Sequence, residues 1–202
     1  IIFKKNFFFL IYFLKIKNFI INSNKFYFLE MNTRIQVEHP VTELITGIDL
    51  VKEQIKIAEG SKLSFTQSDV IRRGSAIECR IYAEVPENGF MPSPGKITKY
   101  HIGEGPGVWV DTGVYEGANV PTHYDPILAK IITWGINRKE AISRMKRTLK
   151  ESYIAGVKTN LHLHKAILHD SDFEKGIFYT SYLDKKSNNF LVTQDSIDPK
   201  TV

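Results

Sequence analysis

The sequence predicts an α+β fold, because alternating segments typical of strands occur together with segments that carry helix caps. Polar residues occupy every second position from Glu30 to Glu38, and a second alternating segment runs from Ala76 to Ala83. Alternate side chains of a strand point to opposite faces. Asn137 precedes a long helical pattern with Glu140 placed for a capping box. We therefore expect a chain that combines strands with packed helices.

Composition limits the class of protein. The chain has 202 residues, of which 43% are hydrophobic, enough for one sizeable core or two small ones. Its net charge is +5, but acidic residues are interspersed after residue 25 and no basic stripe with interleaved aromatics occurs, so nucleic-acid binding is not expected. The single cysteine, Cys79, excludes an intramolecular disulfide framework and fits a reducing, cytoplasmic-type compartment.

Residues 1–25 differ from the rest, since they are almost only Ile, Phe, Lys and Asn. The longest uncharged apolar run, Phe7 to Leu14, has eight residues, whereas a membrane span needs about 20. A signal peptide would need a small-residue cleavage site, and none is visible. AT-rich codons encode these residue types, so one interpretation is translated non-coding sequence joined to a gene fragment. The other is an amphipathic extension, which would suit a basic membrane-surface protein.

The residues between 30 and 38 bring unusual chemistry to one strand face. Glu30, Asn32, Arg34, Gln36 and Glu38 supply carboxylates, amides and a guanidinium, which suit a hard cation, an anion and a proton transfer. Fully extended, this segment would span about 26 Å, too far for one small site. We therefore expect the strand to bend into a loop after Arg34.

Helices and a connector are predicted next. Pro40 to Thr46 is a short helical turn ended by Gly47, and Asp49 caps a helix from Leu50 to Ala58 that ends at Gly60. This helix should pack against another element, because one face carries four apolar residues: Leu50, Val51, Ile55 and Ala58. Residues 61–73 form a polar connector with a helical turn after Ser68.

The strand from Ala76 to Ala83 has a polar face with Glu78 and Arg80 and an apolar face with Cys79. The pattern by itself favours a solvated polar face. We expect Cys79 to be a buried thiol. The later elements follow from the same rules: strands at Lys96–His101, Val108–Asp111 and Pro126–Trp134, a turn-rich connection at Val114–Val120, a helix from Asn137 to Ile154 stopped by Gly156, a helix opened by Lys158–Asn160 and reaching Leu168, and a polar, disordered tail from Ser187. His162 and His164 point in different directions on that last helix, which disfavours a zinc site.

The run Glu30–Glu43, EMNTRIQVEHPVTE, resembles the signature of biotin carboxylase, the ATP-grasp subunit or domain of biotin-dependent carboxylases such as acetyl-CoA carboxylase, which serves fatty acid biosynthesis. ECRIYAE at residues 78–84 and FMPSPGKI at 90–97 are also family-like. The resemblance implies the end of an ATP-grasp domain at 26–60, a connector at 61–73 and a biotin carboxylase C-terminal domain, an antiparallel sheet with packed helices, at 74–186. Residues 1–25 and the tail 187–202 fall outside it.

The resemblance also implies roles for individual residues. Glu30 and Asn32 would hold Mg²⁺ or Mn²⁺ on ATP, and Glu38 would be the general base for bicarbonate, which forms carboxyphosphate. Arg34, Gln36 and the Val37 backbone would bind bicarbonate, with Arg34 counted among the catalytic residues. Arg80 would bind biotin and stabilise its enolate.

The partners implied are a biotin carboxyl carrier protein or domain, a carboxyltransferase and a second copy of the chain in a homodimer. The resemblance implies a cytoplasmic or organellar-matrix enzyme, with neither nucleic acid nor a membrane span. The upstream lid and adenine contacts of such enzymes are not in this sequence, so we expect the chain alone to be incomplete for activity. The alternative is a non-catalytic module that keeps only dimerisation or carrier-docking surfaces. The final carboxyl acceptor is not readable from these residues.

Overall fold

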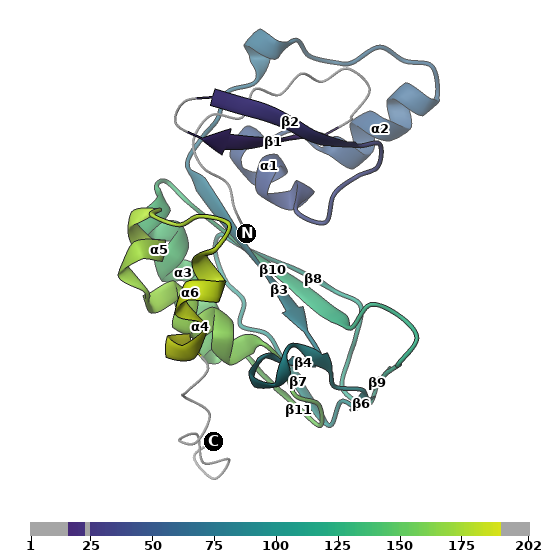
Figure 1. Cartoon of the computed structure of the whole chain (residues 1–202). Helices are drawn as coiled ribbons and strands as arrows, with labels where there is room; N and C mark the ends of the chain where they lie inside the picture. The colour runs from purple at the N-terminus through teal and green to yellow at the C-terminus, as the bar shows by residue number, and fades with distance from the viewer. Residues whose placement is uncertain (1–15, 23–24, 191–202) are drawn as a thin grey trace.

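The structure, a computed structural model, describes residues 16–22 and 25–190 (Figure 1). Its strands are β1 (Ile16–Asn22), β2 (Lys25–Asn32), β3 (Ser75–Tyr82), β4 (Glu84–Val85), β5 (Met91–Pro92), β6 (Gly95–Lys96), β7 (Lys99–His101), β8 (Val108–Thr112), β9 (Asn119–Val120), β10 (Ile127–Gly135) and β11 (Tyr153–Ala155). Its helices are α1 (His39–Thr46), α2 (Leu50–Ala58), α3 (Arg138–Glu151), α4 (Leu161–His169), α5 (Ser171–Lys175) and α6 (Tyr182–Phe190), with 3₁₀ turns at Gln67–Asp69 and Pro86–Asn88. The predicted α+β class is confirmed.

A three-stranded antiparallel sheet in the order β3-β10-β8 forms the centre of the chain. The apolar face predicted for β3 is buried, with Ile81 at 0% exposure and Cys79 at 2%. It packs with Ile131 of β10 against Met145 and Leu149 of α3, which are also fully buried. Figure 1 shows α3 to α6 gathered on this side of the sheet. The predicted buried thiol is confirmed, and burial raises the pKa of Cys79 to about 12.

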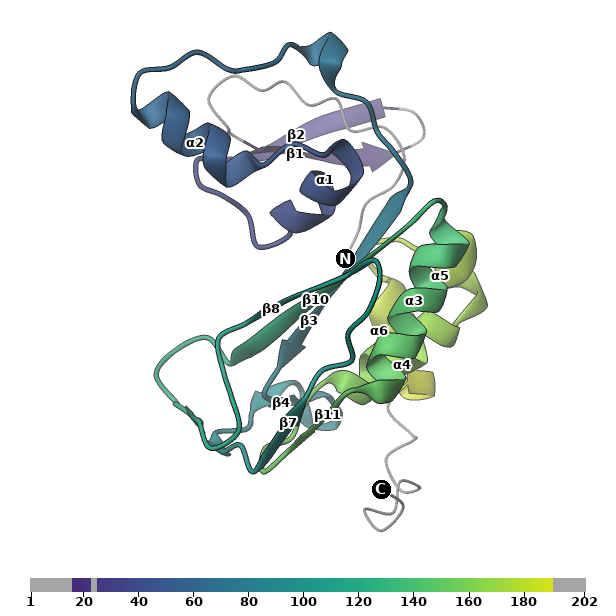
Figure 2. The same ribbon diagram turned by 180° about the vertical axis from the view of Figure 1, so that it is seen from behind.

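Three short strand pairs lie at the end of the sheet that is distant from β1 and β2 (Figure 2). They are β4 with β5, β6 with β9, and β7 with β11. A second, smaller core holds them to the sheet: Ala83, Ile97, Val120, Leu128 and Val157. Gly156 permits the close approach of β11 to this region, because its φ of +97° suits glycine and a Cβ there would lie 2.1 Å from the Lys96 carbonyl oxygen.

The N-terminal part consists of the antiparallel β1–β2 hairpin, α1 and α2. Figures 1 and 2 both show it at one end of the central sheet. Helix α1 contacts β3 and β10. The loop before α1 bonds Arg80 and Lys130, which lie on the polar face of the sheet, whereas α3 packs on the apolar face.

Several predicted boundaries are confirmed, and others are corrected by tertiary contacts. Helix α1 ends at Gly47 in a left-handed cap, and the Asp49 side chain caps α2 by accepting from the Lys52 N–H. The helix that starts after Asn137 ends at Glu151, three residues before the predicted Ile154. Ser152 ends it, because its hydroxyl donates to the Thr148 carbonyl and accepts from the Gly103 N–H. The chain then continues as β11, which pairs with β7.

Other element boundaries also differ from their predicted positions. The single strand predicted from Lys96 to His101 is divided into β6 and β7, because the two pieces pair with different partners, β9 and β11. The helical turn predicted after Ser68 is a 3₁₀ turn that starts at Gln67, because Thr66 caps it with Asp69. The prediction of a polar, disordered tail from Ser187 is wrong for residues 187–190, since they belong to α6, whose last residue, Phe190, is buried. The remainder of that tail, 191–202, lies outside the described residues.

The prediction that α2 buries its apolar face is wrong for this chain, because Val51 is 43% exposed and Ile55 is 56% exposed. Leu50 and Glu53 are the buried residues of that helix. Of the N-terminal segment, 16–22 form strand β1, which the composition did not predict, and Lys25 begins β2, while 1–15 and 23–24 lie outside the described residues. No helix in the described ranges is long and apolar enough to cross a membrane. The predicted domain boundaries stay predictions.

Candidate active site

Glu38 lies at the end of the loop between β2 and α1, immediately before the helix. Pro40 favours a helix start there, because its fixed φ suits the first turn and its missing N–H is not needed. His39 fixes the loop, since its backbone N–H and its Nδ1 lie 3.2 and 2.7 Å from the Gln36 carbonyl oxygen. A carbonyl oxygen only accepts, so Nδ1 carries the proton. The loop presents Glu38 from a well-anchored backbone.

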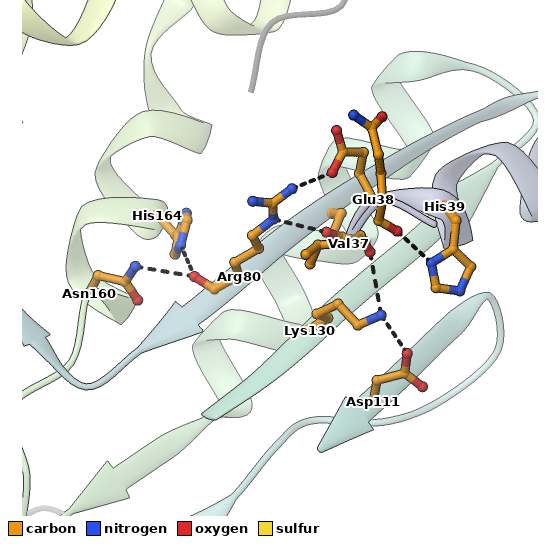
Figure 3. A network of polar contacts seen from close by, with 10 residues as sticks. Val37, Glu38, His39, Arg80, Asp111, Lys130, Asn160 and His164 are labelled. Carbon is orange, nitrogen blue, oxygen red and sulfur yellow. Dashed lines mark hydrogen bonds and ion pairs between the residues drawn. The ribbon is translucent and has the colours of Figure 1, made fainter. Parts of the chain in front are cut away.

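Arg80 of β3 meets Glu38 although 42 residues separate them in sequence. Its Nη2 donates to Glu38 Oε2 at 2.5 Å (Figure 3). The side chains keep 36% and 27% of their surface exposed, so a small substrate can reach both. Burial lowers the pKa of Arg80, but the carboxylates of Glu38 and Glu78 outweigh it and leave the pKa above its ordinary value. The structure thus places the predicted base beside the predicted biotin-binding arginine.

Glu78, two residues before Arg80 on the same strand face, is buried rather than solvated. The sequence pattern alone favoured a solvent-facing strand, but α1 contacts β3, and Glu38 of the loop before α1 bonds Arg80 on this face. Glu78 Oε1 lies 3.4 Å from Arg80 Nε, and its Oε2 has no hydrogen-bond partner among the described residues. Burial raises the pKa of Glu78 to about 7, more than Arg80 and Lys130 lower it. A protonated carboxyl group can therefore stand beside Arg80 near neutral pH.

Lys130 of β10 lies on the same face, directly opposite Arg80 of β3 and Asp111 of β8 in the sheet register. Its Nζ is 2.8 Å from Asp111 Oδ2 and donates to the Val37 carbonyl oxygen at 3.4 Å (Figure 3). Burial raises the pKa of Asp111, but Lys130, Trp109 and His39 outweigh it, so the pKa is lowered and the carboxylate stays charged.

Helix α4 supports Arg80 from behind through its backbone. Asn160 Nδ2 and His164 Nε2 lie 3.1 and 2.9 Å from the Arg80 carbonyl oxygen and donate to it (Figure 3). Asn160 Oδ1 also accepts from the Tyr82 N–H at 3.0 Å. Burial lowers the pKa of His164 to about 4, so it is neutral at physiological pH. Its hydrogen bond to the Arg80 carbonyl oxygen fixes the backbone of β3 at this residue.

The other predicted site residues lie on β2 and the loop after it. Glu30 and Asn32 share a face of β2, with Asn32 Nδ2 3.3 Å from Glu30 Oε1. The strand ends at Asn32, so the ladder gives way to a loop two residues earlier than predicted, since the bend was expected after Arg34. Arg34 is exposed and donates to the Ile35 carbonyl at 3.1 Å. Within the described residues it makes no hydrogen bond or ion pair to Glu38 or Arg80.

No group of three or more His, Cys, Asp or Glu in the described part of the chain could hold a metal ion. His162 and His164 do not form a site, because His164 bonds the Arg80 carbonyl while His162 Nε2 lies 2.5 Å from Glu87 Oε1.

Sequence reasoning missed the roles of Lys130, Asp111, Asn160 and His164. One signal was available for Lys130, which is the single charged residue in the strand ILAKIITWG. A lysine in an otherwise apolar strand needs a partner. The identity of that partner depends on strand register, which no local pattern contains.

Two family models match this chain. One is described as the biotin carboxylase C-terminal domain and matches residues 78–185. The other is described as the ATP binding domain of the carbamoyl-phosphate synthase L chain and matches residues 16–66, so that it begins inside the N-terminal segment rich in Ile, Phe, Lys and Asn. Arg80 falls within the first match and Glu30 to Glu38 within the second.

Similar proteins are named biotin carboxylase or contain a biotin carboxylase domain. Biotin carboxylase of Haemophilus influenzae is 54% identical over 83% of this chain and 37% of its own length. Biotin carboxylase of Pseudomonas aeruginosa is 51% identical over 83% of this chain and 37% of its own. The biotin carboxylase domain dimer of Hydrogenobacter thermophilus 2-oxoglutarate carboxylase, solved with MgADP, ADP and bicarbonate, has a TM-score of 0.84 and 44% identity over 86% of this chain and 39% of that one. The chain thus spans only 37% of the length of these two curated relatives.

Proposed function

Because this chain belongs to the biotin carboxylase family, we propose that its site serves the ATP- and bicarbonate-dependent carboxylation of biotin. One observation carries the proposal: Glu38, suited to proton transfer, contacts Arg80, suited to a developing negative charge, across 42 residues of sequence. Biotin carboxylation needs two steps, activation of bicarbonate and stabilisation of deprotonated biotin. In this proposal the contact between Glu38 and Arg80 brings the groups for both steps into one site.

Glu38 takes the proton of bicarbonate, whose oxygen attacks the γ-phosphate of ATP to give carboxyphosphate and ADP. Arg34, Gln36 and the Val37 backbone bind the bicarbonate, since a guanidinium fork and amide groups suit a planar anion. The anchored loop supports this role, because the carbonyls of Gln36 and Val37 are engaged by His39 and Lys130. The peptides that face the anion are therefore already oriented.

Arg80 serves the second step. When the ureido nitrogen of biotin loses its proton, negative charge develops on the ureido oxygen, and a guanidinium placed beside it lowers the energy of that state. The ion pair with Glu38 holds Arg80 in position, while α4 fixes its backbone. Deprotonated biotin then attacks the carboxyl carbon of carboxyphosphate, which breaks the bond to phosphate, releases inorganic phosphate and forms carboxybiotin.

Glu30 and Asn32 fit a partial site for Mg²⁺ or Mn²⁺. The two side chains share one strand face, where Asn32 Nδ2 lies 3.3 Å from Glu30 Oε1. Carboxylate and amide oxygens are ligands of the kind that Mg²⁺ takes. Mg²⁺ usually keeps several waters and takes other ligands from substrate phosphates, so further ligands would come from water and the nucleotide. When bound, the ion neutralises charge on the nucleotide phosphates.

The partners in this proposal are a biotin carboxyl carrier protein or domain, which delivers biotin, and a carboxyltransferase, which receives the product. A homodimer is proposed by analogy with the Hydrogenobacter thermophilus domain, which was solved as a dimer. The reaction would take place in the cytoplasm or an organellar matrix.

The test compares the Glu38→Gln variant with the wild-type protein, both in the form in which the protein is isolated from its source. Each is assayed for bicarbonate-dependent ADP release and for carboxylation of free biotin. Loss of the general base should lower turnover by roughly 10²-fold or more. Glu59→Gln is the matched control, since Glu59 is an exposed carboxylate after α2. Unchanged turnover of the Glu38 variant would remove the base assignment.

Titrations with ATP and with biotin distinguish the catalytic proposal from a non-catalytic docking module. The enzyme should bind MgATP and show turnover that depends on bicarbonate. A module that binds a biotinylated carrier protein but neither small ligand would replace the catalytic proposal with the docking one.

A further inference from the structure

Lys130 is an unusual residue for its position in the fold. It lies in the middle of β10, between the buried Ala129 and Ile131, and its side chain is only 14% exposed. Removing an ammonium group from water is costly unless the charge is paired and hydrogen-bonded. The sheet register supplies the pairing, because Asp111 of β8 stands directly opposite with its carboxylate 2.8 Å away.

An ion pair within the sheet would satisfy Lys130, but its ammonium also reaches out of the sheet. Nζ donates to the carbonyl oxygen of Val37, 93 residues away in sequence and immediately before Glu38. This bond joins the central sheet to the loop that presents the candidate base (Figure 3). Asp111 restricts where the ammonium can stand and so directs it toward that carbonyl.

The peptide bond is planar, so holding one carbonyl oxygen fixes the plane that joins Val37 to Glu38. The preceding peptide is held in the same way, because His39 Nδ1 donates to the Gln36 carbonyl oxygen. With both peptides held, the direction in which the Glu38 side chain leaves the backbone is restricted to its rotamers. One of these rotamers brings Glu38 to Arg80.

We propose that Lys130, oriented by Asp111, is a positioning residue that holds the Val37–Glu38 peptide and thereby aims the general base. The inference rests on the proposed function for its effect on turnover. Its structural part, that Lys130 holds the loop, does not depend on that function. The alternative is a purely structural role, in which Lys130 and Asp111 stabilise the sheet without affecting the position of Glu38.

The first experiment measures hydrogen exchange of the backbone amides in the loop after β2, comparing Lys130→Met with the wild-type protein. If Lys130 holds the loop, amides near Glu38 should exchange at least tenfold faster in the variant, while the β3 amides stay unchanged. Lys99→Met is the matched control, because Lys99 makes an exposed ion pair with Glu116 at a distant site. Unchanged exchange near Glu38 would overturn the proposal.

The second experiment measures turnover. A misplacement of about 1 Å can cost roughly 10²-fold, so Lys130→Met should lower kcat by about that factor, and Lys130→Arg should recover at least tenfold because a guanidinium can still donate to both oxygens. If Lys130 acts through Glu38, adding Lys130→Met to the Glu38→Gln variant should lower turnover less than threefold further. Equal losses in both backgrounds would instead indicate a purely structural role and overturn the proposal.

The proposal can still be tested if the Lys130→Met variant does not fold or if the wild-type protein has no turnover. If Lys130→Met does not fold, Asp111→Asn keeps the size of the side chain but weakens the hold on the ammonium, and it should show the same loop exchange with a smaller loss of turnover. If the wild-type protein has no bicarbonate-dependent turnover, the proposed function fails, and the exchange measurement still decides whether Lys130 holds the loop.

Discussion

Replacing Glu78 by Gln should make the free energy of unfolding less dependent on pH. Glu78 is buried on the polar face of β3, and burial raises its pKa from 4.5 to about 7 in the folded protein. The unfolded chain exposes this carboxyl group, which then has its ordinary pKa. The folded state therefore holds a proton that the unfolded state has released between these two values.

The sign follows from linkage: where the folded state binds more protons, stability falls as pH rises. The loss begins near pH 4.5 and is complete above the folded-state pKa of about 7. Each pKa unit corresponds to about 1.4 kcal/mol, so between pH 5 and pH 8.5 the wild-type protein should lose about 2 to 3 kcal/mol through this group. Glutamine is neutral at both pH values and should not contribute to the loss.

The assay is urea unfolding of the wild-type protein and of Glu78→Gln at pH 5 and pH 8.5, with the free energy of unfolding taken from the midpoint and slope. The difference between the two proteins should move in favour of the variant by about 2 to 3 kcal/mol on raising the pH. Glu116→Gln is the control, because Glu116 forms an exposed pair with Lys99, and it should change stability by less than about 0.5 kcal/mol at either pH.

A difference that stays constant within about 0.5 kcal/mol would refute the reasoning. So would a variant that becomes relatively less stable at pH 8.5, because it would mean that Glu78 is ionised and stabilised by Arg80 and Lys130 rather than opposed by burial. The attraction of those two cations lowers the pKa of Glu78, and the prediction depends on burial being the larger effect.

Two further predictions concern the frame that carries the site. Gly156→Ala should cost more than about 2 kcal/mol, since the new Cβ would meet the Lys96 carbonyl oxygen at a φ that favours glycine; thermal unfolding should show Gly113→Ala, which has open space, as nearly neutral, and equal losses would contradict this account. Asn137→Ala should cost about 1 kcal/mol, because its side chain accepts from the Glu140 N–H at 3.0 Å. Asn137→Asp keeps the cap, so equal urea midpoints for the Ala and Asp variants would contradict the capping role.

Much of the local structure was predictable from neighbouring residues. Asp49 and Asn137 cap their helices as expected, and the apolar side of β3 is buried as its alternation predicted. The same kind of reasoning failed at Ile154, which lies in β11 rather than in a helix. There, pairing with β7 outweighed the local helical pattern, since ladder hydrogen bonds to a distant strand are invisible to a short window of sequence.

The candidate site shows the same division. The residue types between Glu30 and Glu38 indicated cation, anion and proton chemistry before any fold was known. Their grouping was not predictable, because the structure brings Glu38 to Arg80 and leaves Arg34 exposed without a bond to either. Glu78 was expected on a solvated face and is buried, on the side of the sheet where α1 contacts β3 and Glu38 bonds Arg80.

The sequence by itself determined the chemical groups and the local elements that carry them, because caps, turns and alternation depend on residues only a few positions apart. Only the tertiary structure decided which groups meet. Lys130 reaches Val37 across 93 residues because the register of β10 with β3 and β8 places its ammonium beside Asp111 and under the loop before α1. Strand register and the packing of one element on another are properties of the whole chain, and the position of Glu38 depends on both.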